Sequence, residues 1–172
     1  VSKLWKKKGF QVIMSAYCGG EMLGPVIQSL DLSMKGLDWV FLLGDDGSID
    51  DSVRVAKAAE RYCSAKEYKV FEFDRAGNVS RAKNRLAKIG KEYSEDYPGV
   101  LFCDADDFTY QDKARGLYET AKKKNANLTI GHWLYVNKQL RMNKPRTAEE
   151  SLRRLTFGPW NTLIHSSLIP ED

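Results

Sequence analysis

Three aspartates directly follow a short apolar run in the segment "VLFCDADDFTY", which spans residues 100–110. They are Asp104, Asp106 and Asp107. Carboxylates this close together repel one another and resist losing water, so such a cluster is usually balanced by a positive partner. A hard divalent cation, Mg²⁺ or Mn²⁺, prefers oxygen ligands and accepts one or two protein carboxylates together with phosphate oxygens. The alternative interpretation is a turn followed by a helix cap, although a cap requires only one aspartate.

The spacing of Asp104 and Asp106 indicates how both could bind one ion. The small residue Ala105 separates them, and residues two apart in an extended segment face the same side. We therefore expect Asp104 and Asp106 to be the metal ligands. The side chain of Asp107 is expected on the opposite side of the segment.

A second acidic segment, "DDGS" at residues 45–48, also follows an apolar run. Its ordinary role would be an Asp-Gly turn and a helix cap. In the functional alternative, Asp46 accepts a hydrogen bond from a ring N–H or a ribose hydroxyl. Tyr17 follows another apolar run, where its ring could stack on a flat base or simply pack at the rim of the sheet.

Positive charge comes from the segment "DRAGNVSRAKN" at residues 74–84, which contains Arg75, Arg81 and Lys83 beside a glycine and an expected helix start. Such a segment is typical of contacts to an anion or a base, and equally of an exposed helix face. Together with the two acidic segments and Tyr17, it predicts a nucleoside diphosphate ligand. The parts would be a pocket for the base, a carboxylate for its polar edge, and a metal for the diphosphate.

The elements that would position these residues alternate along the chain. Short apolar runs predict strands at 10–16, 39–43, 69–73, 100–103 and 127–136. Helical periodicity predicts helices at 21–32, 53–63, 77–93, 110–124 and 148–157, with little regular structure after residue 157. Strands that alternate with helices predict an α/β fold, a mostly parallel central sheet flanked by helices on both faces. Ligands of such sheets bind beyond the carboxyl ends of the strands, where these loops should meet.

One detail of the first helix can be predicted from its sequence. Proline favours the first turn of a helix, so we expect regular helix from about Pro25. Met22, Val26, Ile27 and Leu30 should lie on its buried side.

Composition limits the class of protein. A chain of 172 residues with 42% hydrophobic and 29% charged residues suits one globular domain. A net charge of +4 is a mild excess that does not indicate nucleic acid, and we expect no such partner. The three cysteines form no CxxC pair, so we expect them reduced in a cytoplasmic protein. The chain begins without Met and ends abruptly, so it is expected to be a piece of a longer protein.

The basic run "KLWKKK" at residues 3–8 contains one tryptophan, Trp5. It is interpreted either as a solvated arm or as a contact with anionic lipid headgroups. In the second case Trp5 would lie at the membrane interface. The protein would then be peripheral at the inner face of the membrane.

The order of four segments resembles a known family. "VIMSAY", "DDGSIDDS", "GNVSRAKN" and "DADD" follow one another between about residues 10 and 136 as in the family 2 glycosyltransferases. The resemblance implies a Rossmann-like A-type glycosyltransferase fold. It implies that Ser15 and Tyr17 flank the nucleotide base and that Asp46 reads it.

The resemblance also implies roles around the diphosphate. Lys83 stands where the family usually has arginine, and Arg81 is a candidate to share its contact. Asp104 matches the residue near the ribose and the metal, and Asp106 matches the metal ligand itself. The cofactor would be Mn²⁺ or Mg²⁺.

The activity implied by the resemblance is metal-dependent, inverting transfer of a sugar from a nucleotide-sugar donor, a UDP-sugar, to a hydroxyl acceptor such as a growing glycan. The family's catalytic base is the aspartate of a late "ED" motif. We expect the base beyond residue 172, with Asp172 as the candidate within the chain. Residues 1–172 are expected to form one domain, in which 10–136 bind the donor and 137–172 begin an incomplete acceptor part.

Two alternatives remain open. A module that holds a nucleotide-sugar without turnover would also lack the catalytic base, and an assay of donor hydrolysis would separate it from an enzyme. A nucleotidyltransferase would need a glycine-rich loop with a basic residue after the first strand to bind a triphosphate. The segment "YCGGEMLG" has the glycines but no basic residue, which disfavours the second alternative.

Overall fold

The computed structural model describes residues 5–7, 9–130 and 162–169. Its strands form one six-stranded sheet in the order β3-β2-β1-β4-β6-β5. The strands are β1 (Phe10–Ala16), β2 (Trp39–Asp45), β3 (Glu67–Glu72), β4 (Gly99–Asp104), β5 (Leu128–Ile130) and β6 (Thr162–His165). The first four pair in parallel, whereas β6 runs antiparallel to both β4 and β5. The predicted α/β class with a mostly parallel sheet is therefore confirmed.

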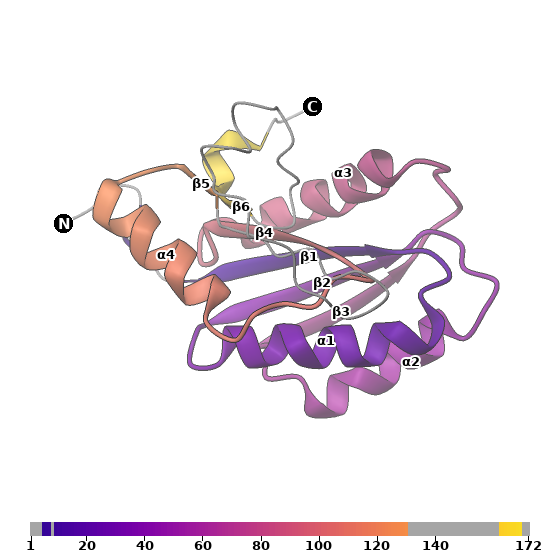
Figure 1. Ribbon diagram of the computed structural model, residues 1–172. Coiled ribbons are helices and arrows are strands. Elements are labelled where there is room, and N and C mark those ends of the chain that lie inside the picture. Colours follow the sequence, from indigo (N-terminus) through magenta and orange to yellow (C-terminus); the bar gives the residue numbers. More distant parts are fainter. Residues whose placement is uncertain (1–4, 8, 131–161, 170–172) are drawn as a thin grey trace, which may run out of the picture.

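Helices cover both faces of this sheet (Figure 1). They are α1 (Gly20–Met34), α2 (Ser52–Ala59), α3 (Val79–Gly90) and α4 (Lys113–Lys124), with short 3₁₀ turns η1 (Glu60–Tyr62), η2 (Lys91–Tyr93) and η4 (Ser166–Leu168). Helices α1, α2 and α4 pack on one face and α3 packs on the other. Alternate residues of β1 serve the two cores, since Val12 and Met14 pack toward α1 and Ile13 packs toward α3. Burial on both faces explains why the central strands are continuous apolar runs.

The first helix begins earlier than the sequence predicted. It starts at Gly20, and Pro25 lies inside it. A tertiary contact fixes this first turn, because the Gly20 backbone N–H donates to Ser52 Oγ (3.0 Å) at the start of α2. The expected burial of Met22 is also wrong: Met22 is 47% exposed, and Leu23 is buried instead.

The expectation of little regular structure after residue 157 is wrong for β6. Its four residues, Thr162–His165, form a strand because β4 and β5 flank it on both sides. So short a segment carries too little periodicity to be recognised without those partners. Of the predicted strand at 127–136 the structure describes Leu128–Ile130, and the predicted helix at 148–157 lies outside the described residues.

The predicted interfacial role of Trp5 is wrong, because Trp5 is a core residue that is 3% exposed. Its ring packs edge-on against Tyr118 of α4 and His165 of β6, with centroid distances of 5.9 and 5.1 Å. Its indole N–H donates to the carbonyl oxygen of Ala126 (2.8 Å). Trp5 therefore joins the segment before β1 to the edge of the sheet formed by β5 and β6. It is buried in the core and not available to a lipid surface.

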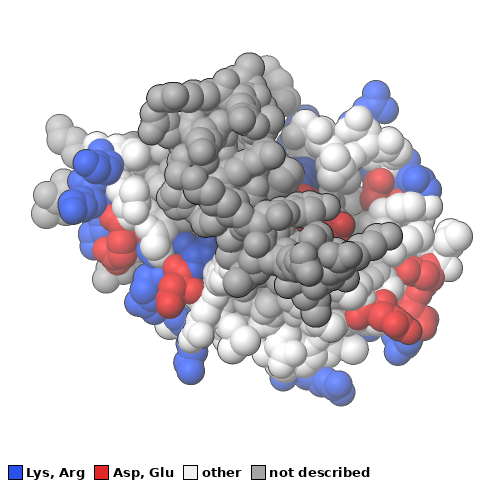
Figure 2. Space-filling model, in the orientation of Figure 1, with Lys and Arg blue, Asp and Glu red and all other residues white. Residues whose placement is uncertain are grey.

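Basic side chains do not form one patch on the face in Figure 2, where they are dispersed among acidic ones. Lys7 of the basic run pairs with Asp96 (2.5 Å), which offsets part of its charge. In the part of the chain that the structure describes, no helix has the length and apolarity needed to cross a bilayer.

Replacing Trp5 should test this packing. We expect Trp5→Ala to lower the free energy of unfolding by about 3–5 kcal/mol, the usual cost of deleting a buried aromatic side chain. Urea denaturation measures the effect, with Lys6→Ala at the adjacent exposed position as the control. Equal denaturation midpoints for Trp5→Ala and the parent would contradict the core assignment.

Candidate functional site

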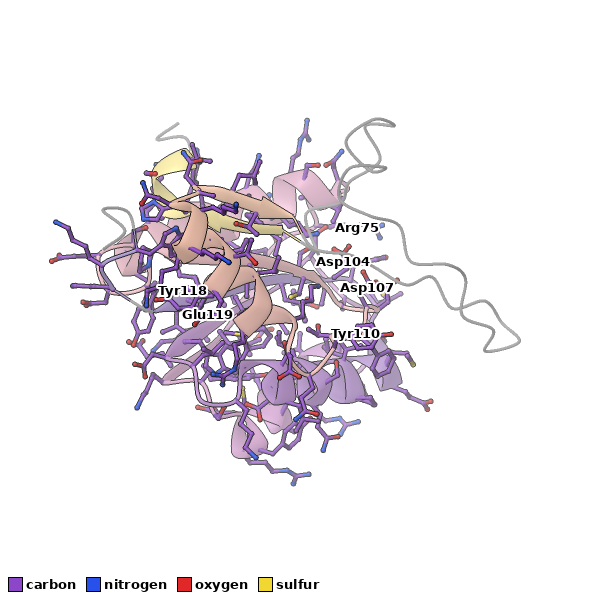
Figure 3. The ribbon with its side chains drawn as sticks, turned by 60° about the vertical axis from the view of Figure 1, so that its left-hand side comes forward. Arg75, Asp104, Asp107, Tyr110, Tyr118 and Glu119 are labelled. Atoms are coloured by element: carbon purple, nitrogen blue, oxygen red, sulfur yellow. The ribbon has the colours of Figure 1, made fainter. Side chains whose placement is uncertain are left out.

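The register of the parallel strands brings the predicted residues to one edge of the sheet. Ser15 of β1 pairs with Asp104 of β4, and the next residue, Ala16, pairs with Asp45 of β2. The segments that follow β1, β2 and β4 therefore begin at the same level, as the rule for parallel sheets predicts. Figure 3 shows Arg75, Asp104 and Asp107 gathered at this edge, away from Tyr118 of α4.

A cavity of about 240 Å³ opens at this edge. The predicted residues Ser15, Tyr17 and Asp46 all line it. The segment between β3 and α3 contributes Arg75, Gly77 and Asn78 to the remaining wall, and Val79 and Ala82 of α3 and Ala16 of β1 complete it. The structure thus brings the predicted base-contacting residues together around one space.

Asp46 is buried, with 7% of its surface exposed, and is fixed by hydrogen bonds. Its backbone N–H donates to the carbonyl oxygen of Ala16 (2.8 Å), which continues the pairing of β1 with β2. Its Oδ1 accepts the backbone N–H of Ala76 (2.7 Å), and the Arg85 guanidinium lies 4.0 Å away. Among the described residues Oδ2 accepts no hydrogen bond, which leaves an oriented acceptor at the cavity wall.

The turn role considered for "DDGS" is also present, but it belongs to Asp45. Oδ2 of Asp45 accepts the Ser48 backbone N–H (2.9 Å), and Ser48 Oγ accepts the N–H of Cys18 (2.8 Å). Gly47 has a φ of +76°, and a Cβ there would lie 3.1 Å from the backbone nitrogen of Arg75. The turn therefore orients Asp46 and lets the Arg75 segment approach closely.

Lys83 and Asp104 form an ion pair between α3 and the end of β4. Their side chains are 9% and 24% exposed, so water screens the pair only in part. Asn78 caps α3, since its Oδ1 accepts the backbone N–H groups of Ser80 (2.8 Å) and Arg81 (3.3 Å). Arg81 is exposed, and no ion pair joins it to Asp104 among the described residues. The expectation that Arg81 shares the ligand contact of Lys83 stays a prediction.

The extended geometry predicted for the triple-aspartate tip is wrong as well. The chain turns directly after Asp104, where the N–H of Asp107 donates to the Asp104 carbonyl oxygen (3.3 Å). The alternation of a strand therefore does not decide which carboxylates face the same side. The metal-ligand roles of Asp104 and Asp106 stay predictions.

The chemistry of this tip fits a hard cation. Partial desolvation, and then the negative charges of Asp104 and Asp106, raise the pKa of Asp107 above its ordinary value. A cation bound there would relieve that repulsion. The described residues contain no preformed group of three or more ligating side chains, so the tip by itself would hold a metal weakly.

The sequence named Arg75 only as one basic residue of the segment 74–84 and gave it no role of its own. Its guanidinium carbon lies 3.6 Å from the centroid of the Tyr17 ring, and Arg75 Nη1 also donates to Tyr17 Oη. The sequence held a signal for this residue, since it comes shortly after a strand of a parallel sheet. Nothing in the sequence indicated that Arg75 would cover Tyr17.

The model of the family described as "Glycosyl transferase family 2" matches residues 11–168. The chain is also similar to solved structures of S. aureus TarS 1–349. The structure in complex with UDP-GlcNAc has a TM-score of 0.75 and 17% identity, over 93% of this chain and 46% of that one. The structure in complex with UDP has a TM-score of 0.68 and 14% identity, over 93% and 47%.

At these identities the similarity shows the fold, and the chain spans about half the length of the TarS chains. No curated protein matches it.

The ion pair between Lys83 and Asp104 should show energetic coupling. We expect Lys83→Met to lower the free energy of unfolding by about 1–3 kcal/mol, because it leaves the Asp104 carboxylate partly buried and unpaired. Asp104→Asn in the Lys83→Met background should recover part of that loss. Urea denaturation of both single variants and the double variant gives the coupling energy, and additive effects would contradict the pairing.

Proposed function

The chain belongs to glycosyl transferase family 2, and we propose that it transfers a sugar from a UDP-sugar to a hydroxyl acceptor with inversion of configuration. The observation that carries this proposal is the cavity that Tyr17 and Asp46 line, at the same edge of the sheet as the aspartate tip. TarS, which shares the fold, has been solved with UDP-GlcNAc and with UDP, and this supports a uridine nucleotide as the donor group.

The cavity suits the base of the donor. Asp46 Oδ2 is an oriented acceptor for a ring N–H, and its partner oxygen is already held by Ala76. Tyr17 supplies an aromatic ring that is 40% exposed, on which a flat base can stack. Ser15, the residue before the end of β1, lines the same cavity.

The diphosphate would lie toward the aspartate tip. In this proposal Asp106 and Asp104 hold Mn²⁺ or Mg²⁺, and Lys83 keeps the Asp104 carboxylate in place through their ion pair. When bound, the metal would act as a Lewis acid on the diphosphate oxygens of the leaving group. Exposed carboxylates such as Asp106 leave several metal positions for phosphate oxygens.

Sugar transfer also requires a part of the protein that binds the acceptor. The acceptor hydroxyl oxygen bonds to the anomeric carbon as the bond from that carbon to the diphosphate breaks, and a carboxylate takes the hydroxyl proton. The candidate Asp172 lies outside the described residues. We propose that residues 10–136 bind the donor and that the acceptor, such as a growing glycan, binds to the chain that follows. A cytoplasmic location is part of this proposal. Contact of the basic run with a membrane also stays a prediction, although Trp5 no longer supports it.

Removing the negative charge of Asp46 should weaken nucleotide binding. We expect Asp46→Asn to lose roughly 1–3 kcal/mol of UDP binding, because the amide oxygen still accepts from Ala76 but the NH2 group that replaces Oδ2 cannot accept from a ring N–H. Calorimetric titration with UDP measures the loss, with Asp74→Asn as a control at the nearby exposed aspartate. Equal UDP affinity for Asp46→Asn and the parent would remove Asp46 from the site.

Metal and nucleotide should bind cooperatively in the parent protein. Because the diphosphate fills metal positions that the protein leaves to water, each ligand should tighten the other by the same factor. We expect Asp106→Ala to abolish the Mn²⁺ dependence of UDP binding and to leave uridine binding nearly intact. Asp107→Ala should do less, because the family pattern places no ligand there.

Calorimetric titrations of UDP and uridine, with Mn²⁺ present or chelated, test this prediction. If the parent binds UDP equally well in chelator and in Mn²⁺, the metal role is wrong. The aspartates would then act as a turn after β4.

A further inference from the structure

We infer that Arg75 occupies the base-stacking face of Tyr17, and that a nucleotide must displace its guanidinium to bind. The inference rests on the proposed function and adds a residue that sets the strength of base binding. It starts from one contact, in which the guanidinium carbon of Arg75 lies 3.6 Å from the centroid of the Tyr17 ring.

That distance leaves no room for a base between the two groups. Two flat groups in van der Waals contact are about 3.5–4 Å apart, so a base sandwiched between Tyr17 and Arg75 would need about twice the observed separation. The base can use this face of Tyr17 only after the guanidinium has moved. Since Arg75 is exposed, its side chain has solvent into which to move.

The backbone that carries Arg75 is held where it is. The N–H of Phe73 donates to the Asp45 carbonyl oxygen (2.9 Å), and the N–H of Ala76 donates to Asp46 Oδ1 (2.7 Å). Gly47 packs closely against the Arg75 backbone, where an added Cβ would lie only 3.1 Å from the Arg75 nitrogen. The loop backbone therefore holds Arg75 beside Tyr17. The guanidinium can cover or uncover the Tyr17 ring by rotation about the side-chain torsions of Arg75 alone.

The contact also satisfies both partners when no ligand is present. Arg75 Nη1 donates to Tyr17 Oη while the guanidinium covers the ring, so a hydrogen bond and a cation–π contact are both lost on displacement. Exposed cation–π contacts are worth about 0.5–1 kcal/mol, which corresponds to a factor of about two to five in an equilibrium constant. A neutral nucleoside offers the released guanidinium no charge in return.

The test compares uridine binding to the parent and to Arg75→Ala by ligand-observed NMR titration. Removing the competing side chain should tighten uridine binding about two- to fivefold. Arg61→Ala, at an exposed arginine on η1, is the matched control and should leave the affinity unchanged. Tyr17→Leu should weaken uridine binding, and adding Arg75→Ala to it should give no tightening, because the shared ring is gone. Thermal melts of all variants check that each is folded.

The outcomes separate this inference from the proposed function. Weaker or unchanged uridine binding by Arg75→Ala would overturn the inference, since Arg75 would then contact the base or do nothing to it. Tightening that persists in the Tyr17→Leu background would also overturn it. A parent protein that binds neither UDP nor uridine would overturn the proposed donor, and the inference with it. If the parent binds UDP but Arg75→Ala does not tighten uridine binding, the inference is overturned and the proposed donor stands.

Discussion

The parallel pairing of β1 with both β2 and β4 is the constraint on which the site depends. This register sets Ser15 beside Asp104 and Ala16 beside Asp45, so three separate segments of the chain end at one level. The pairing is held by apolar residues that are buried on both faces of the sheet, under α1 and α2 on one side and α3 on the other. Because β1 is paired on both sides, a shift in its register would disrupt the apolar core. It would also move the carboxylates of Asp45 and Asp104 away from the end of β1.

Once the strands are placed, the loops at that edge hold one another. The Asp45 carboxylate accepts a hydrogen bond from the Ser48 backbone, and the Ser48 hydroxyl accepts one from the segment after β1. The Asp46 carboxylate accepts one from the segment after β3. Each of these bonds joins a side chain to a backbone N–H that belongs to no helix or strand ladder. Loops cross-linked in this way lose little further conformational freedom when a ligand arrives, which favours binding.

Two of the inner carboxylates of the site each lie near a cation of the chain. Lys83 pairs with Asp104, and Arg85 lies near Asp46. The more exposed tip differs, since repulsion among its aspartates contributes to the raised pKa of Asp107. Cations of the chain thus offset the charges of Asp104 and Asp46, and negative charge is left at the tip, where a bound cation would compensate it.

The sequence by itself determined the α/β class, the four parallel strands and the gathering of Ser15, Tyr17 and Asp46, because each depends on local patterns and on one rule about parallel sheets. It could not determine β6, whose four residues are a strand only through their neighbours. Nor could the sequence determine where single side chains lie or what they contact. Trp5, Arg75 and Arg81 all lie in basic segments, yet one is buried, one covers Tyr17 and one faces solvent. Those differences arise from contacts between segments far apart in the chain, which residue type and spacing do not encode and which only the packed tertiary structure decides.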